Sequence, residues 1–202
     1  MDDFQRNYEW GKNPSAAIAL EGALHRFHPG YLVRFALSNS QLDLEHATDI
    51  ETERRGFGLR LQRMERLFGS YGGGNSRMMP ELAKTIFCEI TIRGKKEFSG
   101  YTELDKLGMD GAPYYYFYGW NAEWDGGDIL HYVIFRVPVF LELVESGKLP
   151  QQVKRNKGRN DSEFYIYNLL RLKPVDLDAL LLCTAGLYSK FLPSVTRKVV
   201  GS

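Results

Sequence analysis

The sequence predicts a single domain of the α/β (or α+β) class, in which helices flank a mixed β-sheet. The chain has 202 residues, a length that fits one domain, so residues 1–202 are treated as one unit. Hydrophobic residues make up 44% of the chain and aromatic residues 13%, which is enough for a substantial core. Segments of alternating apolar residues are interleaved with segments of helical spacing, and no repeat period appears.

The first half of the chain predicts a helix followed by three strands. Apolar residues recur at helical spacing after Pro14, and the sequence His-Pro-Gly ends that helix. The last two strands are separated by a turn at Gly56. Three consecutive glycines then predict a flexible loop, because ordering glycine costs much entropy. The expected elements are a helix over 14–27, strands over 31–38, 46–51 and 57–63, and a flexible loop over 70–79.

The second half predicts more strands and three helices. β-branched and aromatic residues mark the strands, and prolines precede the two longer helices. A run of bases without acids predicts a basic loop, and the C-terminal end reads as a frayed tail. The expected elements are strands over 86–92, 114–120, 129–137 and 163–170, helices over 101–108, 139–149 and 175–186, a basic loop over 148–160 and a frayed tail over 190–202.

The net charge and the length of the apolar runs indicate where in the cell the protein is expected to be found. The formal net charge is +1, so the charge of the whole chain favours no class of partner. Cys88 and Cys183 both lie in apolar runs and are expected to be reduced core residues. No apolar run approaches about 18 residues, and the first residues are acidic and polar. These features predict a soluble cytoplasmic protein that does not contact a membrane.

Acidic residues cluster around the predicted strand over 46–51. Asp43, Glu45, Asp49, Glu51 and Glu53 fall within a short stretch, and like charges so close together need hydration or a divalent cation. A solvated strand face is one interpretation. Asp49 favours the other, because its neighbours are small or apolar and a carboxylate there needs a partner.

The order of these elements resembles the PD-(D/E)XK nuclease superfamily. A helix carries Glu21, a strand carries Asp49, and after a turn the next strand carries Arg60 and Gln62. The resemblance implies that Asp49 and Glu21 hold Mg²⁺ and that Gln62 takes the place of the second strand acid. The ion in such a site activates water and stabilises charge on the phosphate. The lysine that the family places two residues later is Met64 here.

Lys106 is the candidate to replace that lysine by positioning or polarising the attacking water. It follows "SGYTELD" near an expected helix start, where backbone N–H groups favour phosphate. The alternative is purely structural, with Ser99 or Thr102 capping the helix and Glu103 pairing with Lys106 on its surface.

Basic residues predict contact with DNA or RNA. The segment 148–159 holds five bases and no acid, which suits contact with phosphates, although such a loop is often only solvated. One set of the alternating rings in the run "YYYFYGW" must be buried, so core packing explains most of the run, and the exposed set could stack on bases or fill a protein interface. The candidate nucleic-acid-binding residues are Arg60, Lys154, Arg155, Lys157 and Arg159.

These observations favour a metal-dependent nuclease-like protein that acts on nucleic-acid phosphodiesters. The alternative is a non-catalytic phage or mobile-element protein that binds nucleic acid or a host protein, as an inhibitor or assembly factor. "EITIRG" and "SGYTELDK" together with "YYYFYGW" are similar to uncharacterised phage or prophage proteins. A virion structural subunit is a third interpretation, compatible with the glycine-rich stretch and the β-rich middle of the chain.

Overall fold

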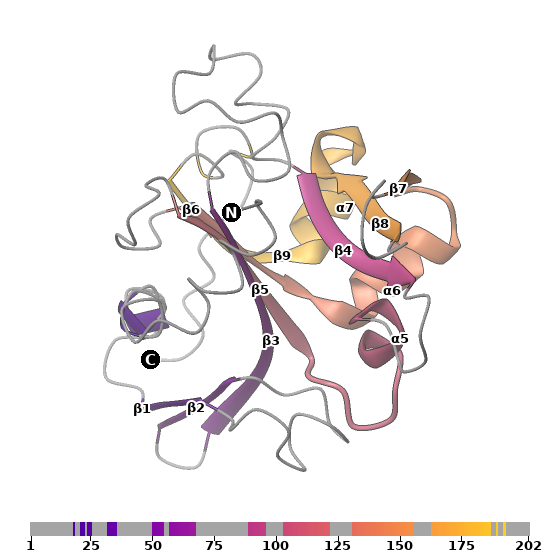
Figure 1. Cartoon of the computed structure of the whole chain (residues 1–202). Helices are drawn as coiled ribbons and strands as arrows, with labels where there is room; N and C mark the ends of the chain where they lie inside the picture. The colour runs from indigo at the N-terminus through magenta and orange to yellow at the C-terminus, as the bar shows by residue number, and fades with distance from the viewer. Residues whose placement is uncertain are drawn as a thin grey trace.

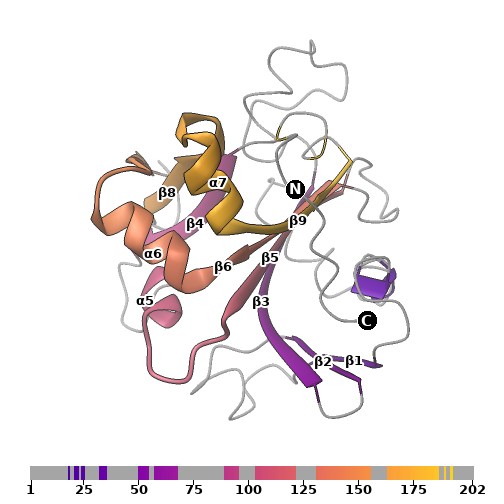
Figure 2. The ribbon, with the colours of Figure 1, turned by 180° about the vertical axis from the view of Figure 1, so that it is seen from behind.

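The computed structural model contains two β-sheets and several short helices (Figures 1 and 2). Its described residues are 18, 21–22, 24–25, 32–35, 50–54, 57–67, 89–95, 103–121, 131–155, 163–186, 189 and 192. The predicted α/β class is confirmed. The predicted loop over 70–79 lies outside the described residues. Leu192, within the predicted frayed tail, is buried in the core.

Sheet A has six strands in the order β1-β2-β3-β5-β6-β9. The pair β3 and β5 is parallel and the other neighbours are antiparallel, so the sheet is mixed as predicted. The predicted hairpins β2–β3 and β5–β6 both form. The strands are β1 (Leu32–Phe35), β2 (Ile50–Arg54), β3 (Phe57–Leu67), β5 (Tyr115–Asn121), β6 (His131–Arg136) and β9 (Leu181–Ala185).

Sheet B has three antiparallel strands in the order β4-β8-β7. These are β4 (Glu89–Lys95), β8 (Glu163–Asn168) and β7 (Gln151–Arg155). The prediction of a basic loop over 148–160 is therefore wrong in its first part, because residues 151–155 pair with β8. The described helices are α5 (Glu103–Leu107), α6 (Val137–Glu145), the 3₁₀ turn η1 (Leu169–Arg171) and α7 (Pro174–Leu180).

Helix α6 begins two residues before its predicted start and ends at Glu145, four residues before its predicted end. A proline occupies its first turn, where no intrahelical N–H is needed. After Ser146 the chain reverses at Gly147, whose φ of 72° is accessible to glycine without strain. The N–H of Gly147 donates to the carbonyl of Val144 at 3.0 Å, and the N–H of Leu149 donates to the carbonyl of Leu143 at 2.9 Å. These bonds satisfy carbonyls at the helix end.

The final expected helix is shorter than the sequence predicts. Helix α7 ends at Leu180, and Leu181–Ala185 becomes β9, which pairs with β6 across a β-bulge. The Arg136 guanidinium donates to the carbonyls of Ala179 at 2.9 Å and Leu181 at 2.8 Å, which fixes this change of direction. Strand pairing and a charged hydrogen-bond donor from β6 therefore override the helical pattern of the segment.

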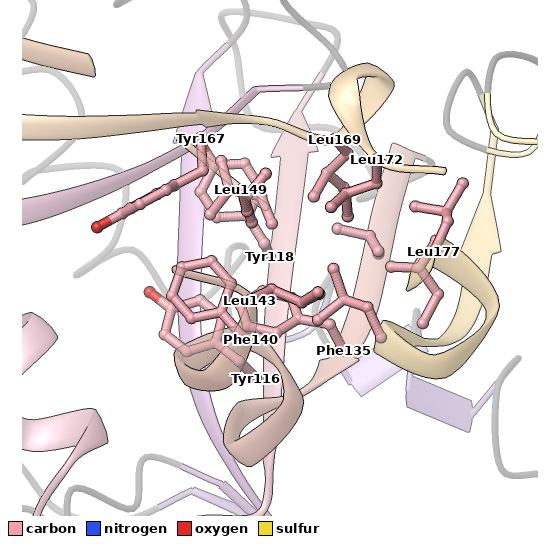
Figure 3. Packing of buried hydrophobic residues seen from close by; sticks show 14 of the residues in the cluster. Tyr116, Tyr118, Phe135, Phe140, Leu143, Leu149, Tyr167, Leu169, Leu172 and Leu177 are labelled. Atoms are coloured by element: carbon pink, nitrogen blue, oxygen red, sulfur yellow. The ribbon is translucent and has the colours of Figure 1, made fainter. Parts of the chain in front are cut away.

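An aromatic column joins sheet A to sheet B through α6 (Figure 3). The ring centroids of Tyr116 and Phe135 lie 5.0 Å apart, those of Phe135 and Phe140 5.1 Å, and those of Phe140 and Tyr167 4.9 Å. All four side chains are fully buried. Aromatic pairs at this spacing contribute energy beyond the area that they bury. The column therefore packs the two sheets against each other through α6.

The opposite face of sheet A has its own buried residues. Phe117 and Tyr132 stack with centroids 5.2 Å apart, and Ile134 is the register partner of Phe117. All three are buried but do not belong to the cluster around Phe140. Because side chains alternate along a strand, β5 and β6 bury both of their faces.

The stability of the protein should depend on pH through Tyr167. Its hydroxyl donates to Oε1 of Gln151 at 2.7 Å. Burial, with a smaller effect of nearby Tyr165, raises the pKa of the Tyr167 phenol above its usual value. The folded protein keeps this proton after the unfolded chain has lost it, so stability is unaffected below about pH 10 and falls at higher pH.

The measurement is urea unfolding of the wild type and Tyr167→Phe at pH 9 and pH 11. Between these values the wild type should lose about 1 kcal/mol more than the variant, because a proton held one pH unit past the unfolded pKa corresponds to about 1.4 kcal/mol. Equal losses in the two proteins would show that Tyr167 does not carry the effect.

Candidate functional site

The β2–β3 hairpin contains Gln62, one of the residues predicted for the metal site. Ile50 of β2 is the register partner of Leu61 of β3, and Glu51 is the partner of Arg60. Gln62 directly follows Leu61 on β3. Asp49 lies outside the described residues, and in the sequence it directly precedes Ile50. The sequence positions of Asp49 and Gln62 thus both adjoin the Ile50–Leu61 pair.

The strand register places Gln62 in the same cross-strand row as two buried residues of sheet A. Gln62 pairs with Tyr116 of β5, and Tyr116 pairs with Phe135 of β6. Partners on neighbouring strands occupy the same face of a sheet. Tyr116 and Phe135 are buried in the cluster that also contains Leu107 of α5. Gln62 therefore occupies a register position on the face of sheet A that carries this buried cluster.

Lys106 lies in the last turn of α5, directly before the buried Leu107. Its side chain is half-buried. The helix packs beside β4, and it ends where the N–H of Gly108 donates to the carbonyl of Asp105 at 3.0 Å. The proposed capping residues Ser99 and Thr102 are outside the described part of the chain. Lys106 thus lies on a helix whose Leu107 belongs to the same buried cluster as Tyr116, the register partner of Gln62.

Glu21 belongs to the N-terminal helix, whose described residues include Leu24 and His25. Its Oε1 atom lies 4.0 Å from Nε2 of His25, one helical turn away, and both side chains are about half exposed. Leu24 is buried but does not belong to the cluster around Phe140. Figures 1 and 2 show this helical segment on the other side of sheet A from α5. Glu21 and Lys106 thus approach sheet A from opposite sides.

The candidate nucleic-acid-binding residues are divided between the two sheets. Arg60 lies on β3 of sheet A, opposite Glu51. Lys154 and Arg155 end β7 of sheet B, opposite Phe164 and Glu163. Lys157 and Arg159 lie outside the described residues. The bases of β7 and the hairpin therefore belong to different sheets.

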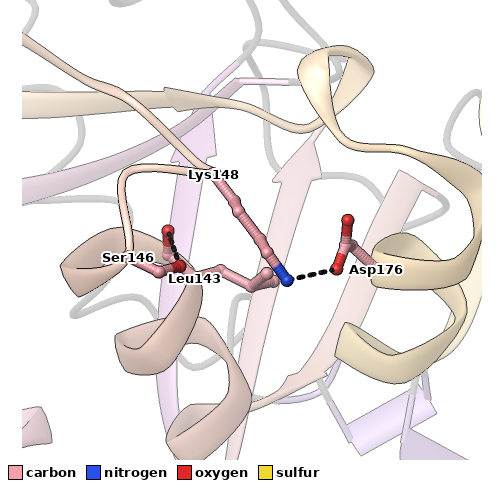
Figure 4. Close-up of polar contacts among 4 residues, drawn as sticks. All are labelled: Leu143, Ser146, Lys148 and Asp176. Atoms are coloured by element: carbon pink, nitrogen blue, oxygen red, sulfur yellow. Dashed lines mark hydrogen bonds and ion pairs between the residues drawn. The ribbon is translucent and has the colours of Figure 1, made fainter.

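Lys148, at the start of the basic segment, has a structural role instead. Its Nζ lies 3.2 Å from Oδ1 of Asp176 on α7, so it ties the end of α6 to α7 (Figure 4). The same turn is closed by Ser146, whose hydroxyl donates to the carbonyl of Leu143 at 3.3 Å. The Lys148 side chain is more than half exposed, so this ion pair contributes little to stability.

The sequence indicated Tyr114 and Tyr115 only as members of the alternating aromatic run, and it did not indicate Arg136. Tyr115 is the register partner of both Leu61 and Arg136, so it continues the Ile50–Leu61 row across sheet A. Burial raises the pKa of the Tyr115 phenol, and the nearby Arg136 charge opposes that shift. Tyr114 is 51% exposed, and its ring meets that of Tyr115 edge to face. The available signal was its position at the start of an alternating aromatic run.

Within the described residues, no group of three or more histidine, cysteine, aspartate or glutamate side chains could hold a metal ion. Asp49 is not among those residues. In the same part of the chain, no helix is long and apolar enough to cross a membrane.

Comparison with protein-family models, with curated proteins and with solved structures finds no match to this chain. The resemblance to the PD-(D/E)XK superfamily stays a prediction from the sequence. The functional argument therefore rests on the position of the hairpin residues in the fold.

Proposed function

We propose that this protein is a metal-dependent nuclease that acts on nucleic-acid phosphodiesters at the β2–β3 hairpin. The observation that carries the proposal is the register of the hairpin. Ile50 and Leu61 are partners, and Asp49 and Gln62 are their immediate neighbours in the sequence. If the antiparallel pairing extends by one residue, these two side chains stand opposite each other on one face of the sheet.

The donor set fits a magnesium ion. A carboxylate from Asp49 and an amide oxygen from Gln62 are hard oxygen ligands, and Mg²⁺ in proteins is commonly held by one or two carboxylates with water and substrate oxygens. When bound, the ion supplies Lewis-acid stabilisation of the phosphate and an activated water. Asp49 and Gln62 would hold and orient that ion.

Lys106 is proposed to position the attacking water in place of the missing strand lysine. Strand β3 has no lysine, and its bases are arginines, which stay protonated and cannot act as tunable bases. Lys106 directly precedes Leu107, which belongs to the same buried cluster as Tyr116, the register partner of Gln62. Glu21 is the weaker ligand candidate, since its helix lies across sheet A from α5.

A non-catalytic function in nucleic-acid binding is the second candidate. The observation that favours it is Met64, which stands where the family has lysine and pairs with the fully buried Tyr118. A protein of this kind would bind DNA or RNA in a salt-sensitive manner without cleaving it.

The deciding experiment incubates the purified wild-type chain with end-labelled single- and double-stranded DNA and RNA. Each substrate is tested with Mg²⁺, with Mn²⁺ and with EDTA. We expect cleavage that requires the metal and stops in EDTA. Binding to any substrate without cleavage in either metal would replace the nuclease proposal with the binding proposal.

A further inference from the structure

Strand β7 forms an open edge of sheet B (Figure 1). In the described part of the chain it pairs with β8 and with no other strand. Gln151, Gln152 and Val153 are all exposed, and the exposed fraction of Val153 is 54%. Because successive residues of a strand face opposite sides of a sheet, exposure at three consecutive positions leaves both faces of β7 in contact with solvent.

Burial decreases from the other strands of sheet B towards β7. Tyr167 of β8 is fully buried, whereas its register partner Gln151 is exposed. At the opposite edge of the sheet, Ile90 and Ile92 of β4 are fully buried, and helix α5 packs beside that strand. The β7 edge is therefore the side of sheet B at which another chain meets an exposed strand.

The main chain of β7 can accept a further strand. An edge strand leaves the N–H and C=O groups of alternate residues pointing away from its sheet. The strand Gln151–Arg155 contains no proline, so it offers both donors and acceptors along its length. Pro150, which has no N–H, directly precedes the strand and marks where the usable edge begins.

The sequence of β7 and of the segment after it is basic. Lys154 and Arg155 end the strand, Lys157 and Arg159 follow, and residues 148–159 contain no acid. Charges on an edge strand commonly prevent pairing between two copies of the same strand. A second copy of β7 would add cations and no acid, whereas a strand that carries Asp or Glu would place opposite charges beside the cations. Charge complementarity therefore favours an acidic strand over a second copy.

We infer that the edge of β7 binds an extended acidic peptide segment of a partner protein, which adds to sheet B as a further strand. Main-chain hydrogen bonds to β7 hold the segment, and its Asp or Glu side chains pair with the cations of Lys154 and Arg155. This function is separate from the proposed cleavage, because β7 belongs to sheet B and the β2–β3 hairpin belongs to sheet A.

The test measures fluorescence anisotropy of a labelled peptide of about nine residues, in which glutamate alternates with valine or threonine. One control peptide carries lysine in place of each glutamate. The other is N-methylated at its central backbone amides and so lacks the N–H donors that a strand needs. We expect the wild type to bind the glutamate peptide, and to bind each control roughly tenfold more weakly or less.

Charge variants locate the binding at β7. Lys154→Gln combined with Arg155→Gln removes both charges of the strand and should weaken binding on the order of fivefold, since each opposite-charge pair between strands contributes to the affinity. Arg171→Gln combined with Lys173→Gln is the matched control, because both residues are exposed bases outside β7. The control should bind the peptide with wild-type affinity.

Proline variants test the main-chain contacts. Gln152 and Val153 are neighbours, so the N–H of one points towards β8 and the N–H of the other points away from it. Gln152→Pro and Val153→Pro are therefore both made, and circular dichroism identifies the variant that folds. Proline at the outward-pointing position keeps the pairing with β8 and should weaken peptide binding roughly tenfold or more. If neither variant folds, the charge variants and the N-methylated peptide decide the matter.

Several results would overturn the inference, and all of them leave the proposed nuclease site untouched. If the wild type does not bind the glutamate peptide, or binds the N-methylated peptide equally well, no strand is added. If the folded β7 variants bind with wild-type affinity, the peptide binds elsewhere. If sedimentation detects a dimer of the wild type that the folded proline variant loses, the occupant of the edge is a second copy of the chain.

Discussion

Replacing Asp49 with alanine is expected to reduce metal-dependent cleavage by on the order of 10³-fold. A catalytic metal contributes several kcal/mol of transition-state stabilisation, and each 1.36 kcal/mol corresponds to a factor of ten in rate. Asp49 is the carboxylate of the proposed site, so its loss removes the main ligand. The measurement is the initial rate of cleavage in Mg²⁺ for the wild type and the variant under identical conditions.

Variants of the same hairpin provide the controls. Glu53→Gln removes an acid whose register partner is Gly58, near the turn and away from the Ile50–Leu61 pair, and should keep the wild-type rate. Gln62→Ala should reduce the rate less than Asp49→Ala, because it removes a neutral ligand. If Asp49→Ala and Glu53→Gln cleave equally well, the acidic cluster is a solvated strand face and the proposed site is wrong.

Replacing Phe140 with alanine is expected to lower the free energy of unfolding by about 3–5 kcal/mol, the usual cost of truncating a buried phenylalanine. Phe140 is fully buried and its ring contacts both Phe135 of sheet A and Tyr167 of sheet B. The variant leaves a cavity between the sheets and loses two aromatic contacts (Figure 3). Urea unfolding followed by circular dichroism measures the change.

Val175→Ala is the control for this stability prediction. Val175 lies in α7 and is 71% exposed, so its truncation should change the free energy of unfolding by no more than about 0.5 kcal/mol. A loss below about 1 kcal/mol in Phe140→Ala would mean that the aromatic column does not join the two sheets as described.

Local patterns predicted most of the elements, and long-range pairing decided the remainder. Pro138 marked the start of α6 to within two residues, because helix starts depend on neighbouring residues, whereas the predicted end at residue 149 was wrong because the chain already turns at Gly147. The segment 181–185 looked helical but forms β9, since β6 and the guanidinium of Arg136 stabilise the strand. The strand β7 was also missed, because its polar sequence gives little strand signal and its pairing partner is β8.

The candidate site was predictable as a hairpin but not as a three-dimensional arrangement. Alternation and a turn at Gly56 identified the two strands. The sequence could not reveal that Gln62 pairs with Tyr116, because that parallel pairing joins strands separated by β4 and α5. Nor could it reveal that Lys154 and Arg155 lie in a strand that pairs with β8, since that pairing depends on a separate segment of the chain.

The most direct test of the central claim is a titration of the wild type and Asp49→Ala with Mn²⁺, in which electron paramagnetic resonance reports the free ion. The account predicts that the wild type binds Mn²⁺ and that the folded variant loses this binding, because Asp49 supplies the charged ligand at the hairpin. Equal binding by both proteins, or no binding by the wild type, would contradict a metal site at Asp49.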